Sequence, residues 1–197
     1  MTKLKPKHDE YFFRCLLLSA ITAVLSLLPF LIDGHGELII ASDYLNQQIP
    51  FSEAARTVIK EGGQWVWGMD LGASSLTAFG FGLIGSPFFL LTLPFPEGSF
   101  PYLAGILYIL KYITASLFAY LYLRLFLKDR RFAVLGALLY AFSGFQSTNH
   151  MFYNFHDSVA FFPLLLSGAE KLREDDRSLS FFSRSHYTDN SAHGKAY

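Results

Sequence analysis

The chain has 197 residues, of which 52% are hydrophobic, 17% aromatic and only 16% charged. Charged residues make up about 25% of a typical soluble domain, so this composition favours a membrane protein. The formal net charge is zero and the sequence has no long basic stretch, which argues against a nucleic-acid partner. The single cysteine, Cys15, lies in an apolar run and has no second cysteine with which to form a disulfide.

The first apolar run covers residues 15–32 and contains no charged residue. Its 18 residues match the roughly 17–25 residues that a membrane-spanning helix needs. Three lysines and Arg14 precede the run, and positive residues favour the cytoplasmic side of a span. A cleaved signal peptide would carry a shorter apolar core and a small-residue cleavage site, which this run lacks. We therefore expect an uncleaved helix over residues 12–32, with its N-terminus in the cytoplasm.

Three later apolar runs also reach the length of a span. They cover residues 101–127, 132–150 and 156–172. A further uncharged run, 71–96, is interrupted by seven glycine and proline residues, unlike an ordinary spanning helix. If it crossed the membrane, the basic turn at 128–131 would lie outside, against the positive-inside bias. We therefore expect residues 76–95 to be a re-entrant or interfacial segment.

These runs together predict an all-α, polytopic membrane bundle of about four spanning helices. In this topology residues 33–100 form a long extracytoplasmic first loop, and residues 1–176 form one membrane domain. Residues 177–197 show no helical or strand period and are rich in polar and small residues. That composition favours a disordered cytoplasmic tail.

A short amphipathic helix is predicted within the loop, over residues 50–61. Pro50 suits the first helical position, and a Gly-Gly pair follows the last turn. Trp65 and Trp67 come shortly after it, and tryptophan favours the headgroup level of a membrane. We therefore expect this helix to lie flat on the membrane surface, in contact with lipid.

Asp43 is the first candidate for chemistry. It lies in the loop among residues that form hydrogen bonds, which include Tyr44 and Gln47. A carboxylate in such surroundings suits a general base that acts on a hydroxyl group, or a ligand for a sugar or metal. The alternative is a structural role, in which Ser42 or Asp43 caps the helix that follows.

Asp157 and His156 lie at the predicted outer end of the fourth span, near His150 at the end of the third. An ionisable group near a membrane interior indicates a functional site. At an interfacial position, however, an acid costs little and needs no special role. The two histidines with Asp43 or Asp157 are candidates for a divalent cation, but no ligand spacing supports a metal site, and none is assigned.

Arg56 and Lys60 lie one turn apart on the polar face of the amphipathic helix. Their positive charges suit the phosphate of an anionic lipid. The alternative is a solvated helix face on which Arg56 forms an ion pair with Glu53, three residues before it.

Most signatures of soluble enzymes do not occur in the sequence, including Gly-x-Ser-x-Gly, the Walker loop and His-Glu-x-x-His. Residues 80–85 match Gly-x-Gly-x-x-Gly, the pattern of dinucleotide-binding proteins. No predicted strand precedes the match, and Ser86-Pro87 follows where a helix should begin. The glycines therefore indicate flexible or closely packed backbone, and we expect the substrate to arrive through the membrane.

Six short motifs follow one another along the chain. They are Ser42-Asp43-Tyr44-Leu45-Asn46-Gln47-Gln48-Ile49-Pro50-Phe51, Leu71-Gly72-Ala73-Ser74-Ser75, Gly85-Ser86-Pro87-Phe88 with Leu90-Leu91, Leu139-Tyr140-Ala141-Phe142-Ser143-Gly144, Asp157 with Pro163-Leu164, and Gly168-Ala169-Glu170-Lys171. The ordered set resembles the YfhO type of bacterial membrane protein, and the likeness extends over residues 10–173.

That family looks like polytopic glycosyltransferases of the GT-C architecture. The resemblance implies a sugar donor carried on a polyprenyl phosphate, a cell-envelope acceptor such as teichoic acid, and a location in the bacterial cytoplasmic membrane. In that architecture an acidic residue of the first outer loop acts as the base, and this role maps onto Asp43. Asp157 matches a second family acid. The residues that we expect to bind substrate are Tyr44, Gln47, Arg56, Lys60, His156 and Asp157.

Members of this family are usually several times longer, with many more spanning helices, so we expect the chain to be an N-terminal portion of such a transferase. The alternative is a non-enzymatic membrane component, either transporter-like or flippase-like, or an inactive truncated remnant. An Asp43 carboxylate that faces an outward groove at membrane level would favour transfer. Charged residues around a central cavity would favour transport.

Overall fold

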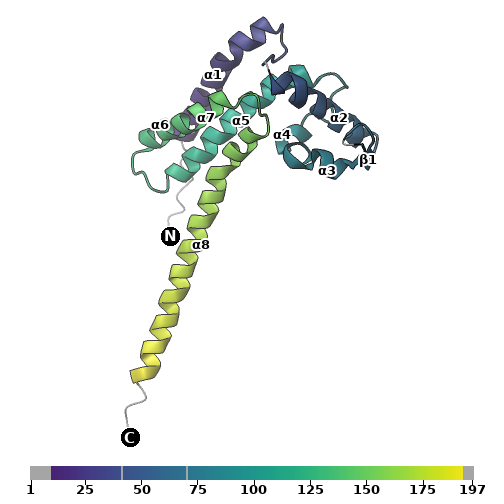
Figure 1. Cartoon of the computed structure of the whole chain (residues 1–197). Helices are drawn as coiled ribbons and strands as arrows, with labels where there is room; N and C mark the ends of the chain where they lie inside the picture. The colour runs from purple at the N-terminus through teal and green to yellow at the C-terminus, as the bar shows by residue number, and fades with distance from the viewer. Residues whose placement is uncertain (1–9, 41, 70, 193–197) are drawn as a thin grey trace.

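The computed structural model describes residues 10–40, 42–69 and 71–192. The described chain is mostly helical, with very little strand, as the sequence predicts (Figure 1). In chain order its elements are α1 (Glu10–Asp33), η1 (Tyr44–Gln48), α2 (Ile49–Lys60), β1 (Trp65–Val66), β2 (Ala73–Ser74), α3 (Ser75–Phe79), η2 (Gly80–Ile84), α4 (Pro87–Leu90), α5 (Phe100–Leu123), α6 (Arg130–Ala141), α7 (Gly144–Thr148) and α8 (Phe155–Ala192). The lysines of the predicted cytoplasmic N-terminus and the last residues of the predicted tail, 193–197, lie outside the described residues.

Two of the described helices, α1 and α5, are long and apolar enough to cross a membrane. Each has 24 residues, which corresponds to a length of about 36 Å at 1.5 Å per residue. That length exceeds the hydrocarbon core of a bilayer, which is about 30 Å thick. The helices expected over 12–32 and 101–127 are therefore present, although the second ends earlier, at Leu123.

Small residues allow α1 and α5 to pack closely. Cys15, Ser19 and Ala23 lie four residues apart on one face of α1, and all three are fully buried. On α5, a Cβ atom at Gly105 would lie only 2.7 Å from Leu31 Cδ2 of α1, so a larger residue there would displace the Leu31 side chain. Between apolar helices in lipid, contact of this kind is a main source of association.

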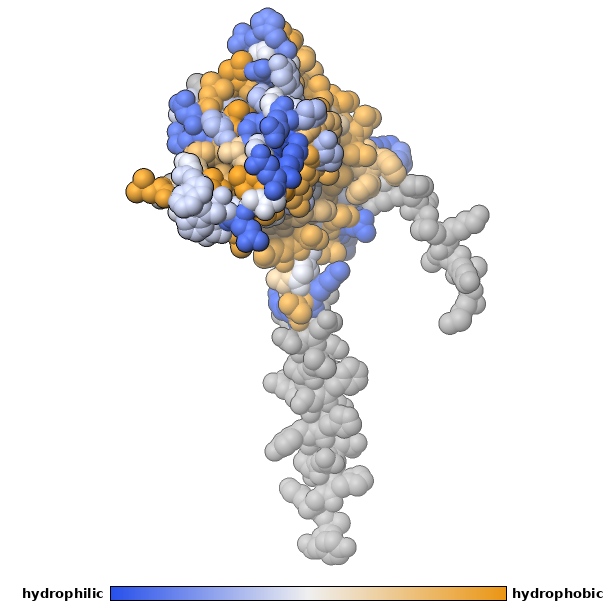
Figure 2. Space-filling view, turned by 90° about the vertical axis from the view of Figure 1, so that its right-hand side faces the viewer, coloured by the Kyte–Doolittle hydropathy of each residue, from blue (hydrophilic) through white to orange (hydrophobic). Residues whose placement is uncertain are grey.

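The outer face of α1 is apolar and exposed. Its exposed side chains are Phe13, Leu17, Leu18, Ile21, Val24, Leu25, Leu28, Phe30 and Ile32. Figure 2 shows that apolar side chains also cover much of the visible face of the molecule, around a polar patch. In water so much exposed apolar surface would be unfavourable, whereas hydrocarbon tails accommodate it.

The prediction of one continuous helix over 132–150 is wrong. The structure divides it into α6, of 12 residues, and α7, of five, with an extended residue, Ser143, between them. A 12-residue helix is about 18 Å long, shorter than the hydrocarbon core. Ser143 and Gly144 have low helix propensity, and the break lets the following segment turn back toward α5.

The helix predicted over 156–172 is present as the first part of α8. Pro163 lies inside this helix and has no N–H to donate to the carbonyl of Val159. The hydroxyl of Tyr140, on α6, donates to that carbonyl at 2.8 Å. The freed backbone group is thus satisfied by a neighbouring helix, and α8 continues past the proline.

The tail predicted to be disordered from residue 177 is instead helical through Ala192, because α8 continues to that residue. The sequence between Ala169 and His193 contains neither glycine nor proline. Extension of an existing helix adds one hydrogen bond for each residue that is fixed, so polar residues without a breaker can follow it.

The segment between α1 and α5 folds into a small lobe made of η1, α2, β1, β2, α3, η2 and α4, which lies to one side of α5 in Figure 1. β1 and β2 pair antiparallel, with Trp65 opposite Ser74. Within 71–96, all of which the structure describes, the longest helix has five residues. This run therefore holds no spanning helix; its depth in the membrane stays a prediction.

The amphipathic helix predicted over 50–61 is present as α2, but its buried face differs from the predicted one. Arg56, assigned to the polar face, is fully buried, as is Ser52, whereas the apolar Phe51 is 39% exposed. The helix therefore presents an arginine to the protein interior, and the partners of that arginine explain why.

Candidate functional site

A buried charged pair lies where α5 meets the start of α8. Lys111 is fully buried inside the apolar helix α5, and its Nζ lies 2.7 Å from Oδ1 of Asp157. The same ammonium group donates to the carbonyl of Tyr153 at 2.7 Å and lies 2.9 Å from the centroid of the Tyr153 ring. A buried lysine is tolerated only with such partners, so the pair and the tyrosine form one unit.

Two histidines and two tyrosines surround this pair. The Tyr108 hydroxyl donates to the carbonyl of His150 at 2.6 Å, and the Tyr112 hydroxyl lies 2.6 Å from His150 Nε2. The rings of His150 and His156 stack at 5.5 Å between centroids, and His156 is fully buried. The short α7 and the turn after it bring His150 to α5, which one straight helix over 132–150 would not do.

Tyr44 connects the lobe to this cluster. Its side chain is fully buried, and its ring centroid lies 6.4 Å from that of Tyr108. Burial raises the pKa of the Tyr44 hydroxyl, and burial followed by the nearby Asp157 charge raises the pKa of Tyr153. Both hydroxyls therefore stay protonated at neutral pH, and neither has a hydrogen-bond partner among the described residues.

Asp43 lies beside Tyr44, at the edge of the cluster. Its carboxylate is half-buried and accepts a hydrogen bond from Gln47 Nε2 at 3.1 Å. Among the described residues its side chain makes no capping hydrogen bond to the helix that follows, so the capping role that the sequence left open is not realised. Gln47 is exposed and holds one carboxylate oxygen in place.

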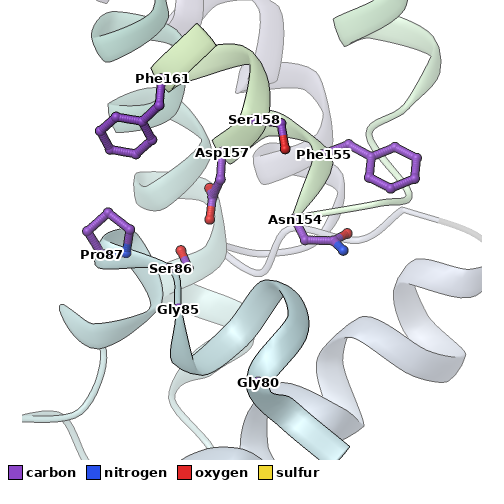
Figure 3. Close-up of a pocket in the computed structure, with 9 residues that line it drawn as sticks. All are labelled: Gly80, Gly85, Ser86, Pro87, Asn154, Phe155, Asp157, Ser158 and Phe161. Carbon is purple, nitrogen blue, oxygen red and sulfur yellow. The ribbon is translucent and has the colours of Figure 1, made fainter. Parts of the chain in front are cut away.

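Asp157 lines a cavity of about 330 Å³ between the lobe and the first turns of α8 (Figure 3). The lining residues are Gly80, Gly85, Ser86, Pro87, Asn154, Phe155, Asp157, Ser158 and Phe161. In Figure 3 the Asp157 carboxylate and the Ser86 hydroxyl point toward each other. Gly80 and Gly85, the first and last glycines of the Gly-x-Gly-x-x-Gly match, thus form part of the cavity wall. This position agrees with the interpretation of these glycines as closely packed backbone.

Arg56 and Lys60 belong to a second network, away from the Lys111 pair. The Arg56 guanidinium binds both oxygens of Glu53 at 2.9 Å, so the predicted pairing is confirmed although the predicted solvation is not. It also binds Ser99 Oγ and the carbonyls of residues 92, 95 and 96. Lys60 is exposed and donates to the carbonyl of Phe95. Arg56 therefore satisfies carbonyls that no helix satisfies.

Glu53 ties the same network to α5. Its Oε1 accepts a hydrogen bond from the backbone N–H of Phe100, the first residue of α5, at 2.7 Å. A carboxylate is favoured at a helix N-terminus, where backbone N–H groups lack partners. The Glu53–Arg56 pair thus connects α2, the end of the 87–96 segment and α5.

A divalent-cation site is not apparent from the geometry of the described residues, which contain no group of three or more His, Cys, Asp or Glu side chains that could hold a metal ion. His156 Nε2 lies 3.2 Å from the carbonyl of Asn149. The histidine pair therefore lies against tyrosines and backbone.

The sequence interpretation missed Lys111, Tyr108 and Tyr153 as site residues. One signal was available, because Lys111 is the single charge within residues 98–123. A lone lysine in a spanning helix is unfavourable without a partner, so it predicts a buried acid elsewhere in the chain.

The comparisons with known proteins agree with the apolar surface and the two long helices. The profile of the family described as "Bacterial membrane protein YfhO" matches residues 15–184. A search of curated proteins and a search of solved structures each gave no match. The family match includes most of α1, the lobe, the cavity and the Lys111–Asp157 pair. The chain therefore belongs to the YfhO family of bacterial membrane proteins.

Proposed function

We propose that this membrane protein is a glycosyltransferase that moves a sugar from a polyprenyl-phosphate donor to a hydroxyl group of a cell-envelope polymer such as teichoic acid. The observation that carries the proposal is the position of Asp43. Its half-buried carboxylate caps no helix among the described residues and lies beside Tyr44, which packs into the buried cluster. A carboxylate that caps no helix and lies among groups that form hydrogen bonds suits a general base.

In the proposed reaction Asp43 accepts the proton of the acceptor hydroxyl as the hydroxyl oxygen attacks the anomeric carbon of the sugar. The new carbon–oxygen bond forms while the bond from that carbon to the phosphate oxygen breaks. Polyprenyl phosphate leaves with the electron pair. Gln47, which donates to one oxygen of Asp43, leaves the other oxygen for the hydroxyl proton.

The other predicted substrate residues take different places in this proposal. Lys60 is exposed and holds the Phe95 carbonyl with one of its three donors, so two remain for a lipid phosphate. Arg56 is buried and holds α2 against the segment that ends at Pro96. Trp65 and Trp67 are 51% and 79% exposed, which suits contact with lipid headgroups.

The proposed topology places the lobe outside the bacterial cytoplasmic membrane and the N-terminus in the cytoplasm. The acidic balance of the loop and the basic residues at 128–131 support this orientation. The proposal keeps four crossings, with the third divided between α6 and α7, and keeps 76–95 as an interfacial segment. The donor then reaches Asp43 from the outer leaflet.

Replacement of Asp43 tests the proposed base. The full chain in lipid vesicles is given a radiolabelled polyprenyl-phosphate sugar and teichoic acid, and the sugar transferred to polymer is counted. Asp43→Asn keeps the shape of the side chain but cannot accept the proton, so we expect the rate to fall about 100-fold or more. Asp33→Asn, at an exposed acid in the same loop, is expected to keep the rate.

A full transfer rate in Asp43→Asn, with the same melting temperature as the parent chain, would show that Asp43 is not the base. Movement of the intact donor across the vesicle membrane without loss of sugar would instead favour the flippase-like alternative.

A further inference from the structure

The cavity of about 330 Å³ has the size and the lining of a small-molecule site. Binding pockets begin at about 300 Å³ and combine apolar walls with a few polar groups. Here Pro87, Phe155 and Phe161 provide apolar wall, and the polar groups come from Ser86, Asn154, Asp157 and Ser158 (Figure 3). A single ring-sized ligand with both an apolar face and polar edges fits this mixture.

The charges at the cavity select a neutral ligand. Asp157 is paired with Lys111 at 2.7 Å, and Lys111 is fully buried behind it, so the two formal charges sum to zero. A cationic ligand would meet the ammonium group behind the carboxylate, and an anionic ligand would meet the carboxylate itself. Neither gains the net attraction that an unpaired charge would supply.

The hydrogen-bonding capacity of the lining suits hydroxyl groups. An ionised carboxylate has about four acceptor positions, and Lys111 occupies one of those of Asp157. Ser86 Oγ accepts from the N–H of Phe89 at 3.2 Å, which leaves its own proton free to be donated into the cavity. Asn154 and Ser158 supply further donors and acceptors.

Lys111 fixes the direction of the Asp157 carboxylate. Its ammonium group is itself held by the carbonyl and the ring of Tyr153, so the carboxylate has one stable position at the cavity edge. Lys111 faces the cluster and does not line the cavity, which makes it a positioning residue.

We propose that this cavity binds the neutral pyranose ring of the lipid-linked donor. The ring hydroxyls bind Asp157 and its polar neighbours, and the C–H face of the ring packs against a phenylalanine. This inference rests on the proposed function, because it takes the ligand to be the sugar of the donor. It adds the class of sugar, which is uncharged, and the place where the sugar is held.

The test compares binding of three probes to the full chain in lipid nanodiscs by calorimetry. They are farnesyl-phosphoryl glucose, farnesyl-phosphoryl glucuronic acid, which adds a negative charge, and farnesyl phosphate without sugar. We expect the glucose probe to bind about tenfold more tightly than either of the others, the ratio that one good hydrogen bond to a charged group supplies.

A pair of variants tests whether the cavity is the source of the preference for the glucose probe. Ser158→Leu fills the cavity from an exposed position on α8, and we expect it to abolish the preference for glucose while the affinity for farnesyl phosphate stays unchanged. Ala169→Leu adds similar bulk at another exposed position of α8 that does not line the cavity, and we expect it to retain the preference. Asp157→Asn is expected to lower the affinity for the glucose probe about tenfold.

Equal binding of the three probes by the parent chain, or a preference that survives in Ser158→Leu, would overturn the proposal. Asp43→Asn separates this proposal from the proposed function, because the cavity proposal requires it to keep the preference for glucose. If that preference holds while the parent chain transfers no sugar, the cavity proposal stands and the transferase proposal fails. If the parent chain transfers sugar and Ser158→Leu keeps the preference for glucose, the transferase proposal stands and the cavity proposal fails.

Discussion

Arg56 connects three parts of the protein with one side chain. Replacement by methionine keeps most of its volume but leaves Glu53 and the carbonyls of residues 92 and 96 without their cationic partner, while the Phe95 carbonyl keeps Lys60. Because one half of a buried pair then remains, we expect Arg56→Met to reduce the free energy of unfolding by about 3 kcal/mol. Unfolding in detergent, followed by near-ultraviolet circular dichroism of the two tryptophans, measures this change.

Lys60→Met is the matched control, since Lys60 lies one turn away, holds one of the same carbonyls and is exposed. We expect it to cost less than about 1 kcal/mol. Equal losses in the two variants would contradict the role of Arg56.

A second prediction at the residue scale concerns the Lys111–Asp157 pair. Lys111→Met leaves a largely buried carboxylate without its partner, and we expect a loss of about 3–5 kcal/mol in the free energy of unfolding. Adding Asp157→Asn removes the unpaired charge, so the double variant should recover most of the loss. A double-mutant cycle from the same unfolding measurement gives the coupling, and simple additivity of the two single changes would exclude a coupled pair.

The sequence predicts single residues best where a charge stands out from its surroundings. Asp43 and Asp157 are candidates because each is an acid near an apolar run. Lys111 was equally conspicuous, but its partner is remote in sequence, and spacing alone does not identify it. Arg56 was assigned to a solvated face because the carbonyls that it binds belong to a distant, irregular segment.

At the scale of elements, the contact between α1 and α5 depends on Gly105. Gly105→Val places new atoms within reach of Leu31, which a Cβ atom alone would approach to 2.7 Å. We expect a loss of about 1–3 kcal/mol from this overpacking, measured by unfolding in detergent. Leu31→Ala in the same chain should restore part of the loss, because it removes the atoms that clash.

Gly168→Val is the control for helix propensity, since nothing lies within 4 Å of a Cβ atom at Gly168 on α8. If it destabilises the protein as much as Gly105→Val does, the effect belongs to the backbone rather than to the α1–α5 contact.

The elements that the sequence predicts well are those with one dominant physical cause. Uniform apolar runs of sufficient length predict α1 and α5, and periodic polar and apolar residues predict α2. The break between α6 and α7 and the extension of α8 depend on tertiary contacts and on helix propagation, which a hydropathy pattern does not contain.

At the scale of the whole molecule, two long apolar helices support a lobe. Tyr44 of this lobe is buried in the protein interior, whereas its two tryptophans are exposed at the surface. The lobe, the cavity and the Lys111–Asp157 pair lie within the stretch that matches the YfhO family. A transferase that uses a lipid-linked donor from the outer leaflet requires the lobe to lie on the outer side. The proposed roles of Asp43 and of the cavity therefore both require this orientation of the chain.

Labelling of single cysteines in intact cells tests that orientation most directly. In a Cys15→Ala background, cysteine replaces Glu61 or Glu97 in the lobe, Lys128 in the basic turn or Lys171 on α8, all exposed positions. We predict that a membrane-impermeant maleimide labels the two lobe positions in intact cells and the two lysine positions only after lysis. Labelling of the lysine positions from outside, with the lobe positions protected, would contradict a transferase site at the outer surface.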